Sequence, residues 1–238
     1  MFASNSQIKK IDALRYKPVI YLPDVFDEYT LWRMRNAVTE LAKASQNIST
    51  GPHMEKYVDP LTIYHSFIER KAAPHIKHYT DFDCGYVAKA YEPFRLHSDG
   101  IRHALDDYFL SVLAPISLDG ENSERNKFYM FEQKTRHATV FKRDKNTQVN
   151  PHYRFATTKE EYDAVLIDPK YGEDNSKVLE NCSHLNAEDL DGLSLLEEFP
   201  WKPGDLFIFD ARYVHVSSNF LDLGIKSKTN LVYSFRLS

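Results

Sequence analysis

Hydrophobic and polar positions divide the chain into short apolar segments separated by turn-forming residues. The segments 86–91, 108–113 and 128–133 are rich in the aromatic and β-branched residues that strands favour. A further apolar run, 206–209, follows a Pro-Gly-Asp turn, and the run 228–236 lies near the C-terminus. Several short strands separated by turns predict a mainly β protein with a barrel-type sheet.

Two helices are predicted in the N-terminal part, after a short strand at 17–22. Apolar residues recur at helical spacing in the segment 24–41 and, less regularly, in the segment 61–79. Each helix would therefore pack one face against the sheet. Polar, Gly and Pro residues dominate between them, at 46–60, which predicts a loop, either near the mouth of a site or on the plain surface.

The pairing of the later segments is also predicted from their order. The strand at 128–133 is expected to form a hairpin with a strand at 137–141. From 143 to 194 the chain turns polar, and its Pro and Gly residues allow only short helices, at 158–166 and 183–190. We interpret 1–238 as a single domain with an insertion at 143–194, which would be a substrate-selecting lid or surface elaboration.

Candidate metal ligands stand at the ends of two predicted strands. His97 and Asp99 are two residues apart, so on a strand their side chains point the same way and can reach one ion. His215 follows the apolar run that begins at Leu206. Two histidines and one carboxylate form the facial triad of non-haem Fe(II) oxygenases. His103 is an alternative ligand, although its polar surroundings give it no fixed direction.

These motifs occur in a particular order along the chain. The order is Leu96–Asp99, then 113–118, then 128–133, then 201–219, then 228–237. It resembles the Fe(II)/2-oxoglutarate-dependent dioxygenase superfamily, especially its phytanoyl-hydroxylase-like and small phage or bacterial branches, over roughly residues 84 to 238. The resemblance implies a double-stranded β-helix core, a jelly-roll of the cupin-like kind, with the N-terminal helices packed on one sheet.

The resemblance also implies the cofactors and their ligands. Fe(II) would be held by His97, Asp99 and His215, and 2-oxoglutarate would chelate the iron while its distal carboxylate pairs with a cation at the start of the last strand. Even-numbered residues of 228–236 share one face, which places Lys228 and Asn230 at this anchor. Arg236 gives the family's Arg-x-Ser spelling but lies about 26 Å further along, at roughly 3.3 Å per residue, and is the less favoured alternative.

The activity implied is hydroxylation of an unactivated C–H bond in a small-molecule or side-chain substrate, with dioxygen consumed and succinate and CO2 released. Asp99 stands where the family's halogenases have a small residue, which favours hydroxylation. Two other interpretations remain open. The chain could be a cupin-type metalloenzyme that does not use 2-oxoglutarate, since the anchor motif is broken, or a non-catalytic barrel that acts as a binding module.

Composition and charge narrow the remaining classes. A net charge of -4 and the lack of a glycine-rich phosphate loop give no support for nucleic-acid or nucleotide binding. Cys84 and Cys182 form no Cys-x-x-Cys motif, so no disulfide scaffold or zinc–cysteine site is indicated. No signal peptide or membrane span is visible, so a soluble, cytoplasmic protein is expected. No pattern indicates an oligomeric state.

Overall fold

The computed structural model describes most of the chain, and its strands account for most of the regular structure. The described residues are 19–44, 47–50, 53–58, 62–76, 82–97, 99, 109–133, 139–142, 152–155, 175–190, 193–211 and 213–236. The strands are β1 (Val19–Leu22), β2 (Asn47–Thr50), β3 (Met54–Val58), β4 (Phe82–Ala90), β5 (Phe109–Leu118), β6 (Lys127–Gln133), β7 (Thr139–Lys142), β8 (His152–Phe155), β9 (Leu193–Pro200), β10 (Leu206–Asp210), β11 (Val214–Ser217) and β12 (Lys228–Arg236). The helices are α2 (Glu28–Lys43), α3 (Thr62–Ala72) and α5 (Ser176–Asn181), with 3-10 turns η1 (Ala73–His75), η2 (Ala187–Leu190) and η3 (Phe220–Leu223).

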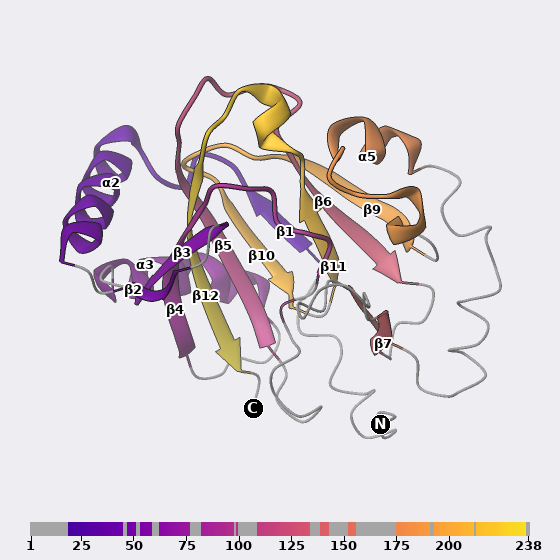
Figure 1. Cartoon of the computed structure of the whole chain (residues 1–238). Helices are drawn as coiled ribbons and strands as arrows, with labels where there is room; N and C mark the ends of the chain where they lie inside the picture. The colour runs from indigo at the N-terminus through magenta and orange to yellow at the C-terminus, as the bar shows by residue number, and fades with distance from the viewer. Residues whose placement is uncertain are drawn as a thin grey trace.

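The strands form one large and one small antiparallel sheet. The large sheet has the order β1-β10-β5-β12-β4-β3-β2, and the small sheet has the order β11-β6-β9 (Figure 1). Neighbours in these sheets are mostly far apart in sequence, as β12 shows by pairing with both β4 and β5. Such long-range antiparallel pairing is what a jelly-roll requires. A third, two-stranded sheet contains β7 and β8.

Alternating side chains give each sheet an inner and an outer face. On β6, Phe128 and Met130 pack with Phe207 and Phe209 of β10, which places these four residues between the two sheets. Tyr129 and Phe131 of β6 therefore face outward. The space between the sheets is thus lined by Phe128 and Met130 of β6 and by Phe207 and Phe209 of β10.

Helices α2 and α3 cover the outer face of the large sheet, as predicted (Figure 1). Leu31, Met34 and Val38 of α2 are buried there, and they recur at the helical spacing seen in the sequence. The helix begins at Glu28 because Asp27 caps it, with its carboxylate accepting a hydrogen bond from the Thr30 amide at 2.8 Å. The predicted start at residue 24 was therefore four residues early.

Two expectations about the strands were wrong. The segment 46–60 contains two strands where a loop was expected, because β2 and β3 form a hairpin that extends the large sheet beside β4. Among the described side chains of this hairpin, Tyr57 is the one that is buried, and main-chain pairing joins β2 to β3 and β3 to β4. The segment 128–133 also does not pair with the next strand. It lies between β9 and β11, and β7 pairs with β8 instead.

The C-terminal part of the expected insertion packs on the small sheet. Val178 and Cys182 of the α5 region, with Leu185, lie against Tyr129 and Val214 on the outer face of β6 and β11. The predicted helix at 183–190 is reduced to η2, and the one at 158–166 lies outside the described residues. The limits of the insertion, 143–194, stay a prediction. In the described part of the chain, no helix is long and apolar enough to cross a membrane.

Candidate functional site

Main-chain hydrogen bonds bring His97, Asp99 and His215 together. His97 and His215 face each other across an antiparallel bridge, in which the two amides donate to the opposite carbonyls at 3.1 and 2.8 Å. The amide of Asp99 donates to the carbonyl of Ala211 at 2.7 Å. The segment that carries His97 and Asp99 is therefore fixed beside β11 and the turn that precedes it. Strand β11 carries His215.

The histidine side chain of β11 points into the space between the sheets. Val214 and Val216 face outward, so His215 between them faces inward. Its ring lies 5.3 Å from the ring of Phe128 and 4.9 Å from that of Phe209. These aromatic walls leave the side chain 6% exposed and fix the direction of the imidazole.

Three ligand atoms converge at one point. Asp99 Oδ1 lies 3.6 Å from His97 Nε2 and 3.8 Å from His215 Nε2. One ligand atom from each residue lies within 4.8 Å of the other two. Both Nδ1 atoms lie near main-chain carbonyls, that of Arg95 at 2.7 Å and that of Tyr213 at 3.0 Å. A proton on each Nδ1 donates to these carbonyls, which leaves the Nε2 lone pairs directed at the shared point.

Ser111 of β5 orients the carboxylate. Its hydroxyl donates to Asp99 Oδ2 at 2.8 Å, so that Oδ1 is the oxygen that faces the two imidazoles. Sequence reasoning missed this residue. A hydroxyl side chain within the apolar run 108–113 was the available signal, because a buried hydroxyl needs a polar partner.

Electrostatics keep the imidazole of His97 in the form that binds metals. Burial lowers the pKa of His97 well below its ordinary value, and the neighbouring His215 lowers it further. The carboxylate of Asp99 opposes this shift without reversing it. His97 is therefore neutral near pH 7, and a neutral imidazole can offer its Nε2 lone pair to a cation.

Lys228 lies at the start of β12 in an apolar enclosure. It is 2% exposed, and its Nζ has no hydrogen-bond partner in the part of the chain that the structure describes. The ammonium lies 4.6 Å from the centre of the Trp201 ring and 5.1 Å from that of Phe220. Burial lowers the pKa of Lys228 to about 7, and the thiol of Cys182 offsets this only in part. A buried cation in this position favours an anionic ligand.

Asn230 lies on the same face of β12 as Lys228. The pairing of β12 with β4 runs without a break past both residues, so the expected alternation of faces holds. The irregularity on the other side belongs to β5, where one extra residue is accommodated opposite Thr229 and Asn230. The Oδ1 atom of Asn230 is buried and, among the described residues, has no hydrogen-bond partner.

The structure gives less information about Arg236 and His103, the two alternative candidates. Arg236 is the last residue of β12, opposite Phe109, and so lies at the other end of this nine-residue strand from Lys228. Its side chain is not among those described. His103, the alternative ligand, lies outside the described residues.

Comparison with known proteins finds likeness in structure and not in sequence. No protein-family model matches the chain, and no curated protein matches it. The structure is similar to HygX from Streptomyces hygroscopicus with nickel, 2-oxoglutarate and hygromycin B bound (TM-score 0.52, 13% identity, 99% of this chain and 88% of that chain). It is also similar to the epimerase SnoN in complex with Fe3+, alpha ketoglutarate and nogalamycin RO (TM-score 0.52, 13% identity, 98% and 86%). A third similar structure is SnoK, a non-heme alpha ketoglutarate dependent carbocyclase from nogalamycin biosynthesis (TM-score 0.51, 12% identity, 98% and 84%).

These similarities establish the fold. The chain shares, over nearly its whole length, the architecture of proteins that contain a metal and 2-oxoglutarate. The mainly β, double-stranded β-helix core expected from the order of the motifs is therefore confirmed. Chemistry is a separate question at 12–13% identity, and it depends on the residues of this chain.

Proposed function

We propose that the protein is an Fe(II)- and 2-oxoglutarate-dependent oxygenase in which His97, Asp99 and His215 bind the metal. The observation that carries this proposal is the convergence of their ligand atoms within 4.8 Å on the jelly-roll scaffold. Two imidazole nitrogens and one carboxylate oxygen form the donor set that suits Fe(II) and leaves coordination positions open on the opposite side.

The surrounding residues fit this role. Main-chain carbonyls hold both Nδ1 atoms, and Ser111 holds the second carboxylate oxygen, so each ligand is oriented by a neighbour. Bound Fe(II) and 2-oxoglutarate would supply the oxidative chemistry, in which the keto acid is decarboxylated to succinate and CO2. The protein's own part is to place the metal, the keto acid and the substrate and to exclude water.

The distal carboxylate of 2-oxoglutarate would bind Lys228 and its neighbour Asn230. A buried ammonium surrounded by Trp201 and Phe220 is unfavourable unless an anion reaches it. The carboxylate would meet this need in a site from which the two rings exclude water. A ligand that pairs with Lys228 at one end and chelates the metal at the other needs two acidic ends, as 2-oxoglutarate has, and a cupin-type enzyme without 2-oxoglutarate would leave Lys228 without this role.

The proposed reaction is hydroxylation of an unactivated C–H bond in a small-molecule or side-chain substrate. Asp99 supports hydroxylation because it supplies the carboxylate ligand that halogenation would have to leave out. The similar structures support a small-molecule substrate, since HygX has hygromycin B bound and SnoN has nogalamycin RO bound.

Anaerobic titration tests the proposal directly. Adding Fe(II) and then 2-oxoglutarate to the protein should produce the visible charge-transfer band of an iron-bound keto acid, and admitting air should release succinate. His97→Ala should lose both the bound iron and the band. His53→Ala is the matched control, because His53 is 62% exposed and pairs with Glu92. If His97→Ala retains full iron and succinate release, the assignment of the metal site is wrong.

A further inference from the structure

The three proposed metal ligands are not equally accessible. The side chains of His97 and Asp99 are 22% and 27% exposed. That of His215 is 6% exposed, because its ring packs against Phe128 and Phe209. The site is therefore closed on the side of β11 and more open on the side of the segment that carries the first two ligands. We expect a substrate to approach the metal along this segment.

Phe94 lies on this segment, three residues before His97. Its ring is 4.5 Å from the imidazole of His97, edge to face, and the residue is 41% exposed. In the described part of the chain, the other exposed large apolar residues are Tyr29, Trp32 and Leu221, which belong to α2 and η3. Single exposed apolar residues are common on protein surfaces. The significance of Phe94 therefore lies in its contact with a proposed metal ligand.

The segment is held in place by contacts that do not involve the ring of Phe94. Two main-chain hydrogen bonds join His97 to His215, and Nδ1 of the His97 imidazole lies 2.7 Å from the carbonyl of Arg95. Leu96 is fully buried and packs in the cluster on the outer face of the small sheet. The imidazole of His97 is thus oriented by other groups, and the exposed surface of Phe94 is available to a ligand.

We propose that Phe94 is a specificity-determining residue that contacts the substrate and selects one with an apolar ring next to the carbon that reacts. This inference rests on the proposed oxygenase function and names the class of its substrate. Aromatic side chains pair with other rings in stacked or edge-to-face arrangements, at centroid distances of about 4.5–7 Å. Because Phe94 touches the imidazole of a metal ligand, a ring that packs on it would bring its own substituents within reach of the metal.

The two residues before Phe94 are compatible with an uncharged ligand. Pro93 is apolar and half-buried, so it extends the apolar surface beside the ring. Glu92 pairs with His53 at 2.5 Å, which occupies its carboxylate and removes its demand for a cationic ligand. A ring that packs on Phe94 would therefore bury apolar surface on both partners.

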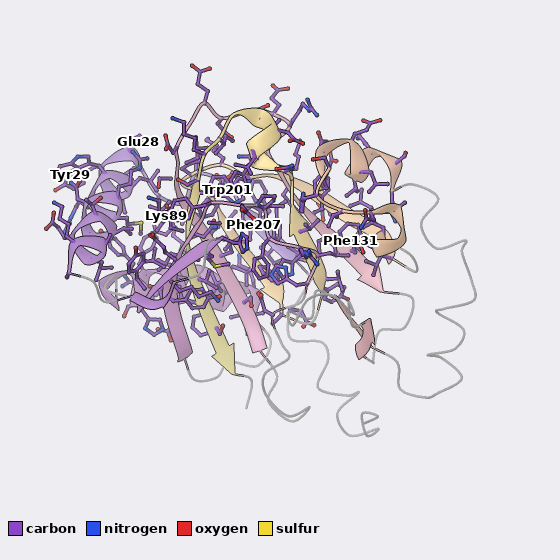
Figure 2. All side chains as sticks on the ribbon, viewed as in Figure 1. Glu28, Tyr29, Lys89, Phe131, Trp201 and Phe207 are labelled. Atoms are coloured by element: carbon purple, nitrogen blue, oxygen red, sulfur yellow. The ribbon has the colours of Figure 1, made fainter. Side chains whose placement is uncertain are left out.

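Tyr29 provides a matched control. It is 66% exposed on α2, which covers the outer face of the large sheet, whereas His215 faces the space between the sheets. Figure 2 labels Tyr29 on this helix, at the edge of the molecule. Phe94→Ala and Tyr29→Ala both remove an exposed aromatic ring, but the second removes it on the other side of the large sheet from the metal site. Phe94→Tyr keeps the ring.

Calorimetric titration of the protein loaded with Ni(II) and 2-oxoglutarate measures binding without turnover. The probes are N-acetylphenylalaninamide, N-acetylcyclohexylalaninamide and N-acetylalaninamide, and a second set, 3-phenylpropanol and propanol, repeats the comparison without the amides. The unsubstituted protein should bind the ring-bearing probes of at least one set about tenfold more tightly than the ring-free probe. Phe94→Ala should abolish most of this preference, whereas Phe94→Tyr and Tyr29→Ala should retain it.

Failure of this inference is distinguishable from failure of the proposed function. If the charge-transfer band does not form with Fe(II) and 2-oxoglutarate in the unsubstituted protein, the oxygenase function itself is wrong, and the inference falls with it. If the band forms but the ring-bearing probes bind no more tightly than their ring-free partners, the substrate class is wrong. Loss of the band in Phe94→Ala would show that the ring supports His97 instead of the substrate. Equal effects of Phe94→Ala and Tyr29→Ala on the preference would also overturn the inference.

Discussion

The proposed function of Lys228 requires a buried ammonium, and this charge lowers the stability of the folded chain. In the folded chain its pKa is about 7, below the ordinary value of 10.5, so the unfolded chain binds the proton more tightly. Between those pH values the unfolded state is more protonated, and the free energy of unfolding should rise as the pH rises. Below about pH 7 the full penalty of a buried ammonium remains, on the order of a few kcal/mol.

Replacing Lys228 with Met should therefore make the free protein more stable while abolishing its affinity for 2-oxoglutarate. The apolar side chain fills the space between Trp201 and Phe220 without a charge, and a gain of about 1 to 4 kcal/mol is expected. Urea unfolding at pH 6.5 measures the gain, and anaerobic titration measures the affinity. A less stable variant would show that Lys228 has a structural role in the free protein.

Binding of 2-oxoglutarate should also depend on pH through the same group. The ammonium form predominates below about pH 7 in the free protein, so affinity should weaken as the pH rises above that value. Lys228→Arg keeps its charge at all these pH values and should remove the dependence. Trp201 reports the binding, because the only other tryptophan, Trp32, can be replaced by Phe. An unchanged dependence in Lys228→Arg would assign the titration to another group.

Ser111 provides a test of how the carboxylate ligand is oriented. Ser111→Ala removes the hydrogen bond to Asp99 Oδ2 and frees the carboxylate to rotate. Affinity for Fe(II) should fall by roughly 10- to 100-fold, the usual effect of losing a group that orients a ligand. Ser117→Ala on the same strand is the control. Equal iron affinity in Ser111→Ala and the unsubstituted protein would show that Asp99 is held by the main chain alone.

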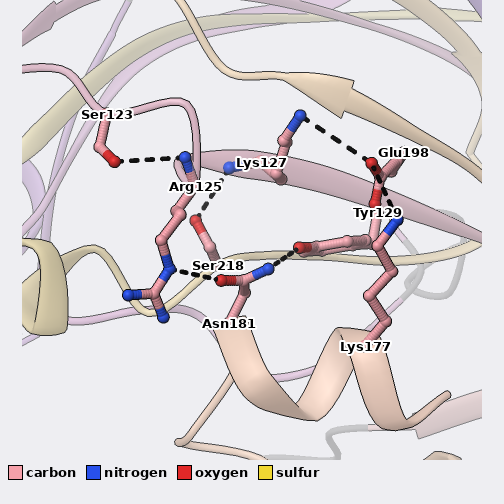
Figure 3. A network of polar contacts seen from close by, with 8 residues as sticks. All are labelled: Ser123, Arg125, Lys127, Tyr129, Lys177, Asn181, Glu198 and Ser218. Atoms are coloured by element: carbon pink, nitrogen blue, oxygen red, sulfur yellow. Dashed lines mark hydrogen bonds and ion pairs between the residues drawn. The ribbon is translucent and has the colours of Figure 1, made fainter.

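At the scale of elements, side-chain hydrogen bonds join α5 to the small sheet (Figure 3). Asn181, the last residue of α5, donates to the hydroxyl of Tyr129 at 3.0 Å and accepts from Arg125 Nε at 3.0 Å. Its main-chain carbonyl also accepts from the amide of Asn219 at 2.7 Å, next to η3. Helix α5 is thus tied to β6 and to the segment that leads into β12.

Asn181→Ala should destabilise the protein by about 1 to 3 kcal/mol. The substitution removes two hydrogen bonds and leaves the hydroxyl of Tyr129, a fully buried residue, without the donor it now has. Thermal unfolding measures the loss. Lys177→Ala is the control, because Lys177 is 67% exposed and its ion pair with Glu198 contributes little. Similar melting temperatures for both variants would contradict this account of α5.

Local signals in the sequence predicted where helices and strands form better than they predicted which strands pair. The apolar spacing of α2 and the alternation of β12 depend on neighbours along the chain, and both were predicted. The β2–β3 hairpin was missed because it joins the sheet by pairing with β4, which lies further along the chain. The pairing of β6 with β9 and β11 was also missed, since it joins segments far apart in sequence.

The candidate site shows the same division. The spacing of His97 and Asp99 and the position of His215 after an apolar run were visible in the sequence, and the structure brings them together. The contribution of Ser111 was not, because its partner Asp99 lies on another segment of the chain. Histidines and a carboxylate at strand ends leave a local signal of their role, whereas a hydroxyl in an apolar run indicates only that it needs a polar partner.

At the scale of the whole molecule, the residues of the proposed site come from both sheets. His215 belongs to the small sheet, and His97 is bridged to it. Lys228 and Ser111 belong to the large sheet. Asp99 connects the two sheets by accepting a hydrogen bond from Ser111. A metal held by the triad together with a dicarboxylate held by Lys228 would therefore bridge the sheets, and both should stabilise the folded chain as a unit.

Thermal unfolding with Ni(II) in place of iron tests this bridging without turnover. Each ligand at about 100 times its dissociation constant adds about 2.7 kcal/mol, and 1 kcal/mol raises the Tm by roughly 2–4 °C in a protein of this size. Ni(II) alone should raise the Tm by about 5–10 °C. 2-Oxoglutarate alone should add little, because its chelating end needs the metal, and together they should exceed the sum of the separate shifts.

Two variants separate the part of the Tm shift that depends on the metal ligands from the part that depends on Lys228. His97→Ala should abolish the response to Ni(II) and with it the response to 2-oxoglutarate, because the keto acid would lack the metal it chelates. Lys228→Met should keep the Ni(II) shift and lose most of the further increment from 2-oxoglutarate. If 2-oxoglutarate stabilises His97→Ala as much as it stabilises the unsubstituted protein, it binds independently of the triad, and the two sheets are not joined through the metal.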